Sequence, residues 1–331
     1  MNKHDSEKVL DKFGKLTIKE PYSKTRFLPR RIRGYIDLLR PFTLLAPIIV
    51  SSAIMVASLI YNRDGTGIDQ NWWFIVGNAS FTMAIVNAAS NVLNQATDVE
   101  ADRLSKPYRP IPRGVVKADE AQSIAYIFYL FALIRAVTIN VWFGFFVFLI
   151  MLFTVTYSLP PRIKKYLFLN QVWIALPRGF FGVLAAWSVF GDPFQKLPLA
   201  IGAIATTYLI GGMATKDIVD SDADKKTGTH TMINTYGSKK TALVSFPFMF
   251  FPFALVLPMI NEGWLEHYLW PLVFLLIPSC LIFYFMIRET ESKTLENVHA
   301  WSIMYIEYIF FALGFSLLVI FSGLESFPFN F

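Results

Sequence analysis

The residues that could do chemistry gather in two acidic segments of the chain. The first, which reads NQATDVEADRLSKPYRP, places Asn94, Asp98 and Asp102 at four-residue intervals. At about 100° per residue, a helix carries these three side chains within an arc of about 80°, and Asn87 and Asn91 fall in the same arc. One helical face would therefore present carboxylates and amides, which are oxygen donors suited to a hard cation. The two earlier amides could instead hydrogen-bond to a neighbouring helix.

The second acidic segment reads GGMATKDIVDSDADKKTG. Asp217, Asp220 and Asp224 fall within about 60° of one another on a helix, whereas Asp222 points elsewhere and is expected to be a solvated surface charge. Two carboxylate clusters brought together repel each other, and a divalent cation relieves that repulsion. Mg²⁺ is favoured because every donor is an oxygen and because it leaves coordination sites open for substrate phosphate. The alternative, solvated charges balanced by nearby bases, does not explain two coherent helical faces.

Basic residues adjoin both acidic segments and could bind the anionic oxygens of a metal-bound diphosphate. They follow the first cluster, follow the stretch YSLPP, and precede the second cluster. The predicted diphosphate ligands are Asn94, Arg109, Arg162, Lys164 and Lys216. The predicted metal ligands are Asn94, Asp98, Asp102, Asp217, Asp220 and Asp224, and the five carboxylates among them are the predicted catalytic residues.

The composition indicates that a membrane surrounds the elements that position these residues. Of the 331 residues, 54% are hydrophobic and 16% are charged, and the mean hydropathy is +0.46. A spanning helix needs roughly 20 apolar residues, and nine stretches meet that need: 41–61, 72–94, 119–138, 141–159, 168–190, 198–215, 241–260, 269–287 and 300–322. Because lipid leaves open sheet edges unsatisfied, we expect an all-α polytopic bundle of nine transmembrane helices.

The distribution of Lys and Arg indicates how these helices cross the membrane. The first forty residues are basic and contain no signal-peptide core, so we expect the N-terminus to stay cytoplasmic. With nine spans, all but four of the 30 Lys and Arg residues then fall on the cytoplasmic side, as the positive-inside rule requires. The loops after the second, fourth and sixth spans share that side. We therefore expect a multi-pass protein of the cell membrane with its active site toward the cytoplasm.

The chain is expected to form one membrane domain, 35–331, behind a mobile basic arm, 1–34, with an interfacial helix near 31–40. The net charge of +6 fits loops that face anionic lipid, so no nucleic acid is needed to explain it. Two charged residues, Arg178 and Glu307, lie well inside predicted spans, away from the span ends. Either residue could orient a substrate, or the two could form a structural ion pair.

The two acidic segments resemble the motifs of a known family, the UbiA superfamily of intramembrane prenyltransferases. NQATDVEADRLSKPYRPIPRG is similar to its first motif, an Asn and two Asp at four-residue spacing followed by a Pro-Arg-Pro-like element. KDIVDSDADKKTG resembles its second motif, Asp-x-x-Asp-x-x-x-Asp. YSLPPRIKK and NQVWIALPRG, which lie between them, and the nine-helix plan are also similar to the family. The resemblance covers about residues 35–322.

The resemblance implies a mechanism. Mg²⁺ held by the two acidic clusters would bind an isoprenyl diphosphate, and metal and bases would stabilise the charge on the leaving diphosphate. Aromatic faces could stabilise the allylic carbocation that remains, and a lipophilic acceptor would then attack it. The implied function is transfer of a polyprenyl, geranylgeranyl-like group from its diphosphate to that acceptor.

The sequence leaves the acceptor open between two classes. KPYRPIP resembles relatives that prenylate chlorin or archaeal geranylgeranylglyceryl phosphate ether lipids, whereas NQ before the Asp pair resembles homogentisate-type enzymes, which act on aromatic quinone precursors. Two other functions also stay open. A UbiA-type terpene cyclase needs no acceptor, and a cation-coupled membrane transporter predicts ionisable groups near the bilayer midplane. The position of the acids at cytoplasmic helix ends favours the transferase over the transporter.

Overall fold

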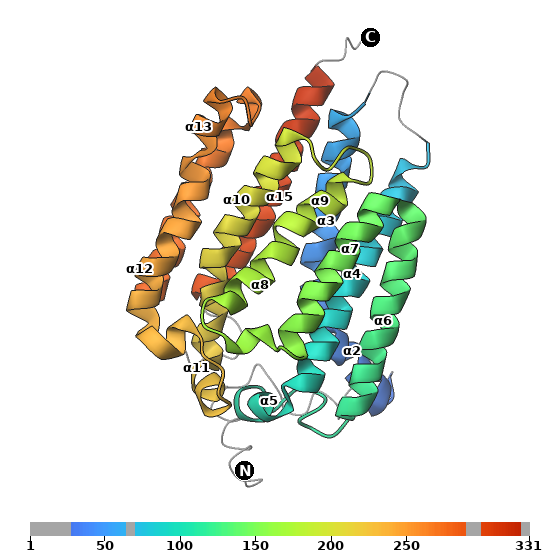
Figure 1. Cartoon of the computed structure of the whole chain (residues 1–331), viewed down its shortest axis with the longest axis vertical. Coiled ribbons are helices and arrows are strands. Elements are labelled where there is room, and N and C mark those ends of the chain that lie inside the picture. The colour runs from blue at the N-terminus through green and yellow to red at the C-terminus, as the bar shows by residue number, and fades with distance from the viewer. Residues whose placement is uncertain (1–27, 64–69, 289–298, 326–331) are drawn as a thin grey trace.

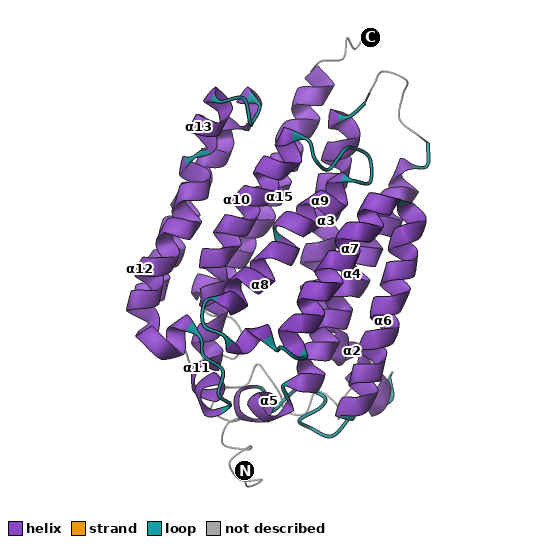
Figure 2. Ribbon diagram, viewed as in Figure 1, coloured by secondary structure: helices purple, strands orange, loops and turns teal. Residues whose placement is uncertain are grey.

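The computed structural model describes residues 28–63, 70–288 and 299–325. Every regular element in these ranges is a helix (Figure 2), which confirms the predicted all-α class for this part of the chain. The α-helices are α2 (Arg30–Leu39), α3 (Pro41–Tyr61), α4 (Trp72–Thr97), α5 (Val99–Ser105), α6 (Ala118–Ile139), α7 (Val141–Ser158), α8 (Leu169–Arg178), α9 (Phe180–Trp187), α10 (Lys196–Gly212), α11 (Asp217–Lys226), α12 (Met232–Ala254), α13 (Val256–Asn261), α14 (Leu276–Arg288) and α15 (His299–Glu325). The 3-10 segments are η1 (Ile163–Lys165), η2 (Met213–Lys216) and η3 (His267–Leu275).

Seven helical segments in the described ranges are long and apolar enough to cross a bilayer. They are Arg30–Tyr61, Ala118–Ile139, Val141–Ser158, Lys196–Lys226, Met232–Asn261, His267–Arg288 and His299–Gly323. Each of the nine predicted stretches contains helix, but two fall outside these seven. α4 carries several amide side chains, and the fifth stretch is divided between α8 and α9. The chain is therefore a multi-pass membrane protein, and the count of nine spans stays a prediction.

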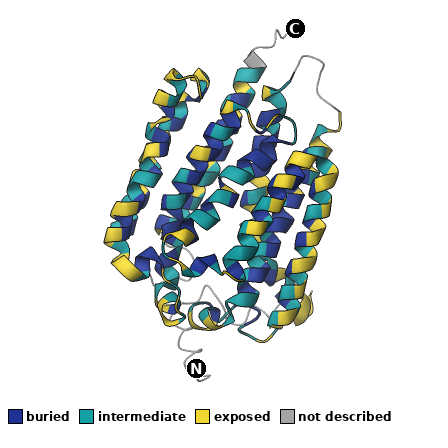
Figure 3. Ribbon diagram, viewed as in Figure 1, coloured by how far each residue is buried: buried dark blue, intermediate teal, exposed yellow. Residues whose placement is uncertain are grey.

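The helices stand side by side with their long axes roughly aligned (Figure 1). α3 packs on α4 and α15, α4 packs on α6, and α10 packs on α12. Exposed residues lie on the outward faces of the bundle, whereas its interior is buried (Figure 3). The largest fully buried side chains are Trp187, Tyr208, Phe143, Phe253, Phe311 and Phe315. Since the outward faces carry many large apolar side chains, they suit contact with lipid.

α2 occupies the position of the interfacial helix predicted near 31–40. Its Gly34 and Leu38 are buried, and a Cβ built on Gly34 would lie 2.5 Å from the Val115 side chain. This helix begins at Arg30 and thus includes the last residues of the predicted basic arm. The first 27 residues of that arm lie outside the described ranges.

The prediction of a single helix over 168–190 is wrong, because the helix is interrupted at Gly179, between α8 and α9. Pro177 has no amide hydrogen with which to continue the helical ladder. Gly179 also presses against α10, since a Cβ built on it would lie 2.6 Å from the backbone nitrogen of Thr206. This close approach requires glycine and fixes the position of Arg178, the last residue of α8.

Gly179→Ala is expected to destabilise the protein by about 1–3 kcal/mol, because the added methyl group meets backbone atoms that cannot rotate away. Thermal unfolding of the detergent-purified protein, followed as loss of the monodisperse species, measures the effect. Gly77→Ala is a matched control in α4, since nothing lies within 4 Å of a Cβ at that position. Equal thermal stability of the two variants would contradict the tight contact between α8 and α10.

Candidate active site

A cavity of about 690 Å³ lies within the bundle and reaches α5 and α11 at one end. All ten residues predicted to bind metal or diphosphate line this cavity: Asn94, Asp98, Asp102, Arg109, Arg162, Lys164, Lys216, Asp217, Asp220 and Asp224. They come from the segment from α4 to α5, the loop after α5, the η1 loop, and the segment from η2 to α11. Three loops predicted to share one side of the membrane thus meet at one cavity, and α5 contacts α11 directly.

The first acidic cluster does not lie on one continuous helix, as the sequence pattern predicted. α4 ends at Thr97 and α5 begins at Val99, so Asp98 sits at the junction with φ −108° and ψ 22°. Arg162 explains the break, because its Nη2 donates to the backbone oxygen of Thr97 at 2.8 Å and to Oδ1 of Asp98 at 3.0 Å. The amide of Asp102 still donates to the backbone oxygen of Asp98 at 2.8 Å, which preserves the spacing of the two acids.

Lys164 binds the same carboxylate from the η1 loop. Its Nζ pairs with Oδ1 of Asp98 and also donates to Oδ1 of Asn94 and Oγ1 of Thr97, both at 3.4 Å. Burial lowers the pKa of the Lys164 ammonium, and the charge of Asp98 opposes that shift. The η1 loop therefore places two bases, Arg162 and Lys164, in contact with Asp98 at the end of α4.

Asp102 and Arg109 form a buried ion pair. Their side chains are 5% and 7% exposed, and Nη1 of Arg109 donates to both carboxylate oxygens at 3.0 and 2.9 Å. Burial raises the pKa of the Asp102 carboxyl, while Arg109 and Lys106 act to lower it. Because this acid is withdrawn from solvent, the alternative of a solvated loop charge is excluded for it.

The second cluster lies on α11, directly after η2. Asp217 is buried, and its Oδ1 lies 3.0 Å from Nζ of Lys216, while its Oδ2 is buried without a hydrogen-bond partner. Asp220 accepts hydrogen bonds from Nζ of Lys106 at 2.5 and 2.6 Å. Asp224 lines the cavity, whereas Asp222 is exposed and does not. The prediction that Asp222 is a surface charge is confirmed.

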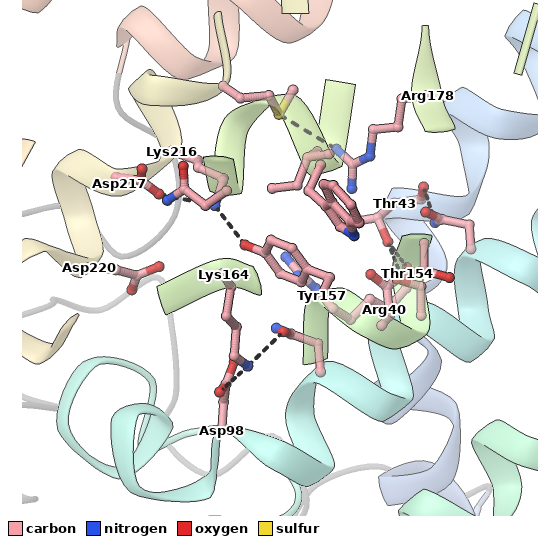
Figure 4. Close-up of a pocket in the computed structure, with 18 of the residues that line it drawn as sticks. Arg40, Thr43, Asp98, Thr154, Tyr157, Lys164, Arg178, Lys216, Asp217 and Asp220 are labelled. Atoms are coloured by element: carbon pink, nitrogen blue, oxygen red, sulfur yellow. Dashed lines mark hydrogen bonds and ion pairs between the residues drawn. The ribbon is translucent and has the colours of Figure 1, made fainter. Parts of the chain in front are cut away.

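Two cavity residues that contact the predicted site residues, Lys106 and Tyr157, were not predicted. Lys106 joins α5 to α11 through Asp220, and its signal in the sequence is its position four residues after Asp102. Tyr157 lies between the clusters, with Nζ of Lys164 and Nζ of Lys216 at 6.0 and 5.9 Å from its ring centroid. The Lys216 ammonium also donates to the Tyr157 hydroxyl at 3.3 Å (Figure 4).

The polar residues deeper in the bundle divide between structural and cavity positions. Asn87 and Asn91 line the cavity and also donate to Thr43 of α3, at 3.1 and 2.9 Å, which confirms the predicted hydrogen bonds to a neighbouring helix. Glu307 is buried outside the cavity lining and accepts hydrogen bonds from Ser279 and Tyr208. Arg178, the other charged residue considered as a possible partner of Glu307, lines the cavity. The ion pair considered for Glu307 and Arg178 does not form among the described residues.

The donors at this cavity fit a hard divalent cation. The acids and Asn94 offer only oxygen, and Oδ2 of Asp217 is a buried carboxylate oxygen that nothing donates to. In the described ranges no three His, Cys, Asp or Glu side chains converge on one point. Asp98, Asp102, Asp217 and Asp220 each contact a Lys or Arg instead. The positive charges of these Lys and Arg residues thus neutralise the carboxylates, as bound metal cations also would.

A model of the UbiA prenyltransferase family matches residues 44–322, which are most of the chain. The chain belongs to this family. Digeranylgeranylglyceryl phosphate synthase of Methanosphaera stadtmanae is 26% identical over 295 residues, which cover 85% of this chain and 98% of that relative. The chloroplastic homogentisate solanesyltransferase of Arabidopsis thaliana is 28% identical over 300 residues, covering 82% of this chain and 74% of that relative. The predicted UbiA resemblance is confirmed.

A solved structure agrees with the UbiA assignment at the level of the fold. The UbiA homolog from Archaeoglobus fulgidus bound to DMAPP and Mg²⁺ matches with a TM-score of 0.65 at 18% sequence identity, covering 88% of this chain and 99% of that one. As a UbiA-family member with a multi-pass helical fold, this protein is a membrane prenyltransferase. It transfers an isoprenyl group from its diphosphate to a lipophilic acceptor.

Proposed function

We propose that this prenyltransferase moves a geranylgeranyl-like group to a glyceryl phosphate ether lipid of the archaeal type. The observation that carries the proposal is the convergence of the α4–α5 and α11 carboxylates on one cavity, with five bases among them. The similarity to digeranylgeranylglyceryl phosphate synthase supports the acceptor. An aromatic quinone precursor is the second candidate, supported by the similarity to homogentisate solanesyltransferase.

In this proposal, residues 1–34 form an N-terminal arm, and residues 35–331 form one domain that crosses the cell membrane nine times. Its α5–α11 end faces the cytoplasm, since that end holds the basic loops. On one side of the cavity, Mg²⁺ would be held by Asn94, Asp98 and Asp102. On the other side, it would be held by three acids of α11: Asp217, Asp220 and Asp224. Bound Mg²⁺ supplies positive charge that neutralises the diphosphate oxygens.

The bases of the cavity complete the proposed diphosphate site. Lys106, Arg109, Arg162, Lys164 and Lys216 each contact an acid in the described structure. Binding of cations and diphosphate lets these bases donate to the phosphate oxygens instead. The bond between C1 of the prenyl chain and the diphosphate oxygen breaks with both electrons leaving on the diphosphate. Acceptor oxygen, or an aromatic carbon in the second candidate, then bonds to C1 and the acceptor loses one proton.

Aromatic side chains line the cavity in which the allylic cation would form. The cavity is lined by Tyr157, Trp173, Trp301, Tyr305 and Tyr308. Aromatic faces attract a cation through the ring quadrupole, and the attraction grows where water is excluded. These rings would therefore stabilise developing positive charge at C1.

Incubation of purified protein with labelled geranylgeranyl diphosphate, Mg²⁺ and each acceptor tests the proposal. We expect diphosphate release and labelled product only when geranylgeranylglyceryl phosphate is added. Product formed with homogentisate alone favours the second candidate. Release without any acceptor supports the terpene cyclase, and cation-driven uptake into vesicles without release supports the transporter.

A further inference from the structure

Arg178 occupies a part of the cavity that the proposed diphosphate site does not use. It is the last residue of α8, next to the break at Gly179, and its side chain is exposed to the cavity. Its backbone is held on both sides, because Tyr308 donates to its carbonyl oxygen at 2.9 Å and Gly179 presses on α10. The guanidinium thus projects from a fixed point into the interior of the bundle.

The charge of Arg178 is unbalanced within the described structure. Its guanidinium makes one weak contact, from Nη1 to Sδ of Met213 at 3.9 Å, and pairs with no carboxylate among the described residues. Five of the other bases that line the cavity each contact an acid, and Arg40 and Lys165 line it as well. The five are Lys106, Arg109, Arg162, Lys164 and Lys216. An uncompensated cation inside a membrane bundle is costly, so an anionic ligand is favoured beside it.

Arg178 also lies apart from the acidic clusters. Figure 4 shows the ring of Tyr157 between Lys216 and Asp217 on one side and Arg178 and Thr43 on the other. The diphosphate site would engage the bases that contact the acids. A second anionic group, separated from the diphosphate by the ring of Tyr157, could therefore bind to Arg178.

The neutral polar groups near Arg178 have partners already. The hydroxyl of Thr43 donates to a backbone oxygen at 2.8 Å and accepts from Asn91 at 2.9 Å. The hydroxyl of Thr154 donates to a backbone oxygen at 3.0 Å and accepts from Tyr129 at 2.9 Å. The Arg178 guanidinium, by contrast, contacts only the sulfur of Met213 among the described residues. A guanidinium binds phosphate or carboxylate through paired hydrogen bonds.

We infer that Arg178 binds the negatively charged headgroup of the acceptor, and that the acceptor is therefore a lipophilic phosphate or carboxylate rather than a neutral alcohol or phenol. This inference rests on the proposed function and adds to it the residue that binds the charged group of the acceptor. A glyceryl phosphate lipid and an aromatic carboxylate both satisfy the chemistry. Holding the anion at Arg178 places the nucleophilic part of the acceptor toward Tyr157 and the diphosphate.

Charged and neutral acceptor pairs test the inference on the unaltered protein. The pairs are geranylgeranylglyceryl phosphate with geranylgeranylglycerol, and homogentisate with its methyl ester. We expect the charged member of the accepted pair to have a kcat/KM about 10- to 100-fold higher, the factor that one charge-assisted contact supplies. The pair that is turned over identifies the phosphate or the carboxylate as the source of the anion.

Arg178→Gln should remove this preference. It is expected to raise the KM of the charged acceptor about 10- to 100-fold and to leave the KM of geranylgeranyl diphosphate nearly unchanged. Arg178→Lys should retain part of the preference, because the charge remains without the paired donors. Arg103→Gln is the matched control, since Arg103 is an exposed residue of α5 that does not line the cavity. Binding of each charged and neutral acceptor, followed by intrinsic tryptophan fluorescence, provides a readout that needs no turnover.

The outcomes separate the inference from the function on which it rests. Equal use of charged and neutral acceptors by the unaltered protein overturns the role of Arg178 and leaves the transferase standing. A raised KM for geranylgeranyl diphosphate in Arg178→Gln also overturns it, because the side chain would then serve the donor. Failure of every acceptor to stimulate diphosphate release refutes the proposed function instead. Tighter binding of the charged acceptor, lost in Arg178→Gln, supports the inference even then.

Discussion

Asp217→Asn and Asp98→Asn are each expected to lower kcat by about 10³-fold, because each removes a negative charge that holds cations at the diphosphate. The two positions come from opposite sides of the cavity, on α11 and at the α4–α5 junction. Asn keeps the shape and one hydrogen-bond acceptor of each side chain. The loss should therefore appear in turnover of labelled geranylgeranyl diphosphate rather than in protein yield or elution volume.

Asp222→Asn is the matched control for these variants. It removes the same charge from the same helix, but Asp222 is exposed and outside the cavity lining. Its kcat should stay close to that of the unaltered protein. Near-normal turnover in either site variant would argue against the assignment of these acids. Asp98 provides the safer comparison, because its side chain is 18% exposed whereas that of Asp217 is 4% exposed, so a change at Asp98 disturbs the packing less.

Chelation of divalent cations with EDTA is expected to reduce acceptor-dependent diphosphate release to background, and excess Mg²⁺ should restore it. Without added cations, five cavity carboxylates would face the oxygens of an anionic substrate, and like charges at short range repel. Labelled product measured across a Mg²⁺ titration gives the dependence.

EDTA already saturated with Mg²⁺ is the control for effects of the chelator itself. The Asp98→Asn variant should also need more Mg²⁺ for half-maximal binding of the cation to the protein alone, a readout that is independent of turnover. Undiminished product formation in EDTA would refute the metal site.

The grouping of the acidic residues could be predicted from the sequence because helical spacing is local. Asn94, Asp98 and Asp102 recur every four residues, and Asp217, Asp220 and Asp224 of α11 follow a similar rule, so the members of each cluster lie close together. All of these residues do line the cavity. Hydropathy likewise predicted the helices, because a membrane helix must satisfy its backbone and bury apolar side chains within a single stretch of chain.

The breaks in the helices could not be predicted from spacing alone. Asp98 leaves the helical path because Arg162, which lies 64 residues away in the chain, binds both its carboxylate and the neighbouring carbonyl oxygen of Thr97. α8 ends where Gly179 meets the backbone of Thr206. Both events depend on a surface contributed by another helix, and a local pattern carries no information about that surface.

The sequence by itself determined the class of the protein, the two faces of oxygen donors and the family, since these depend on residue type and on spacing within one helix. Only the tertiary structure decided which basic residue forms an ion pair with which acidic residue. Lys106 reaches Asp220 across 114 residues of chain, and Arg178 lines the cavity without Glu307, its suggested partner. Electrostatic pairing acts through space at a few ångströms, so it depends on how the helices pack and not on their order in the chain.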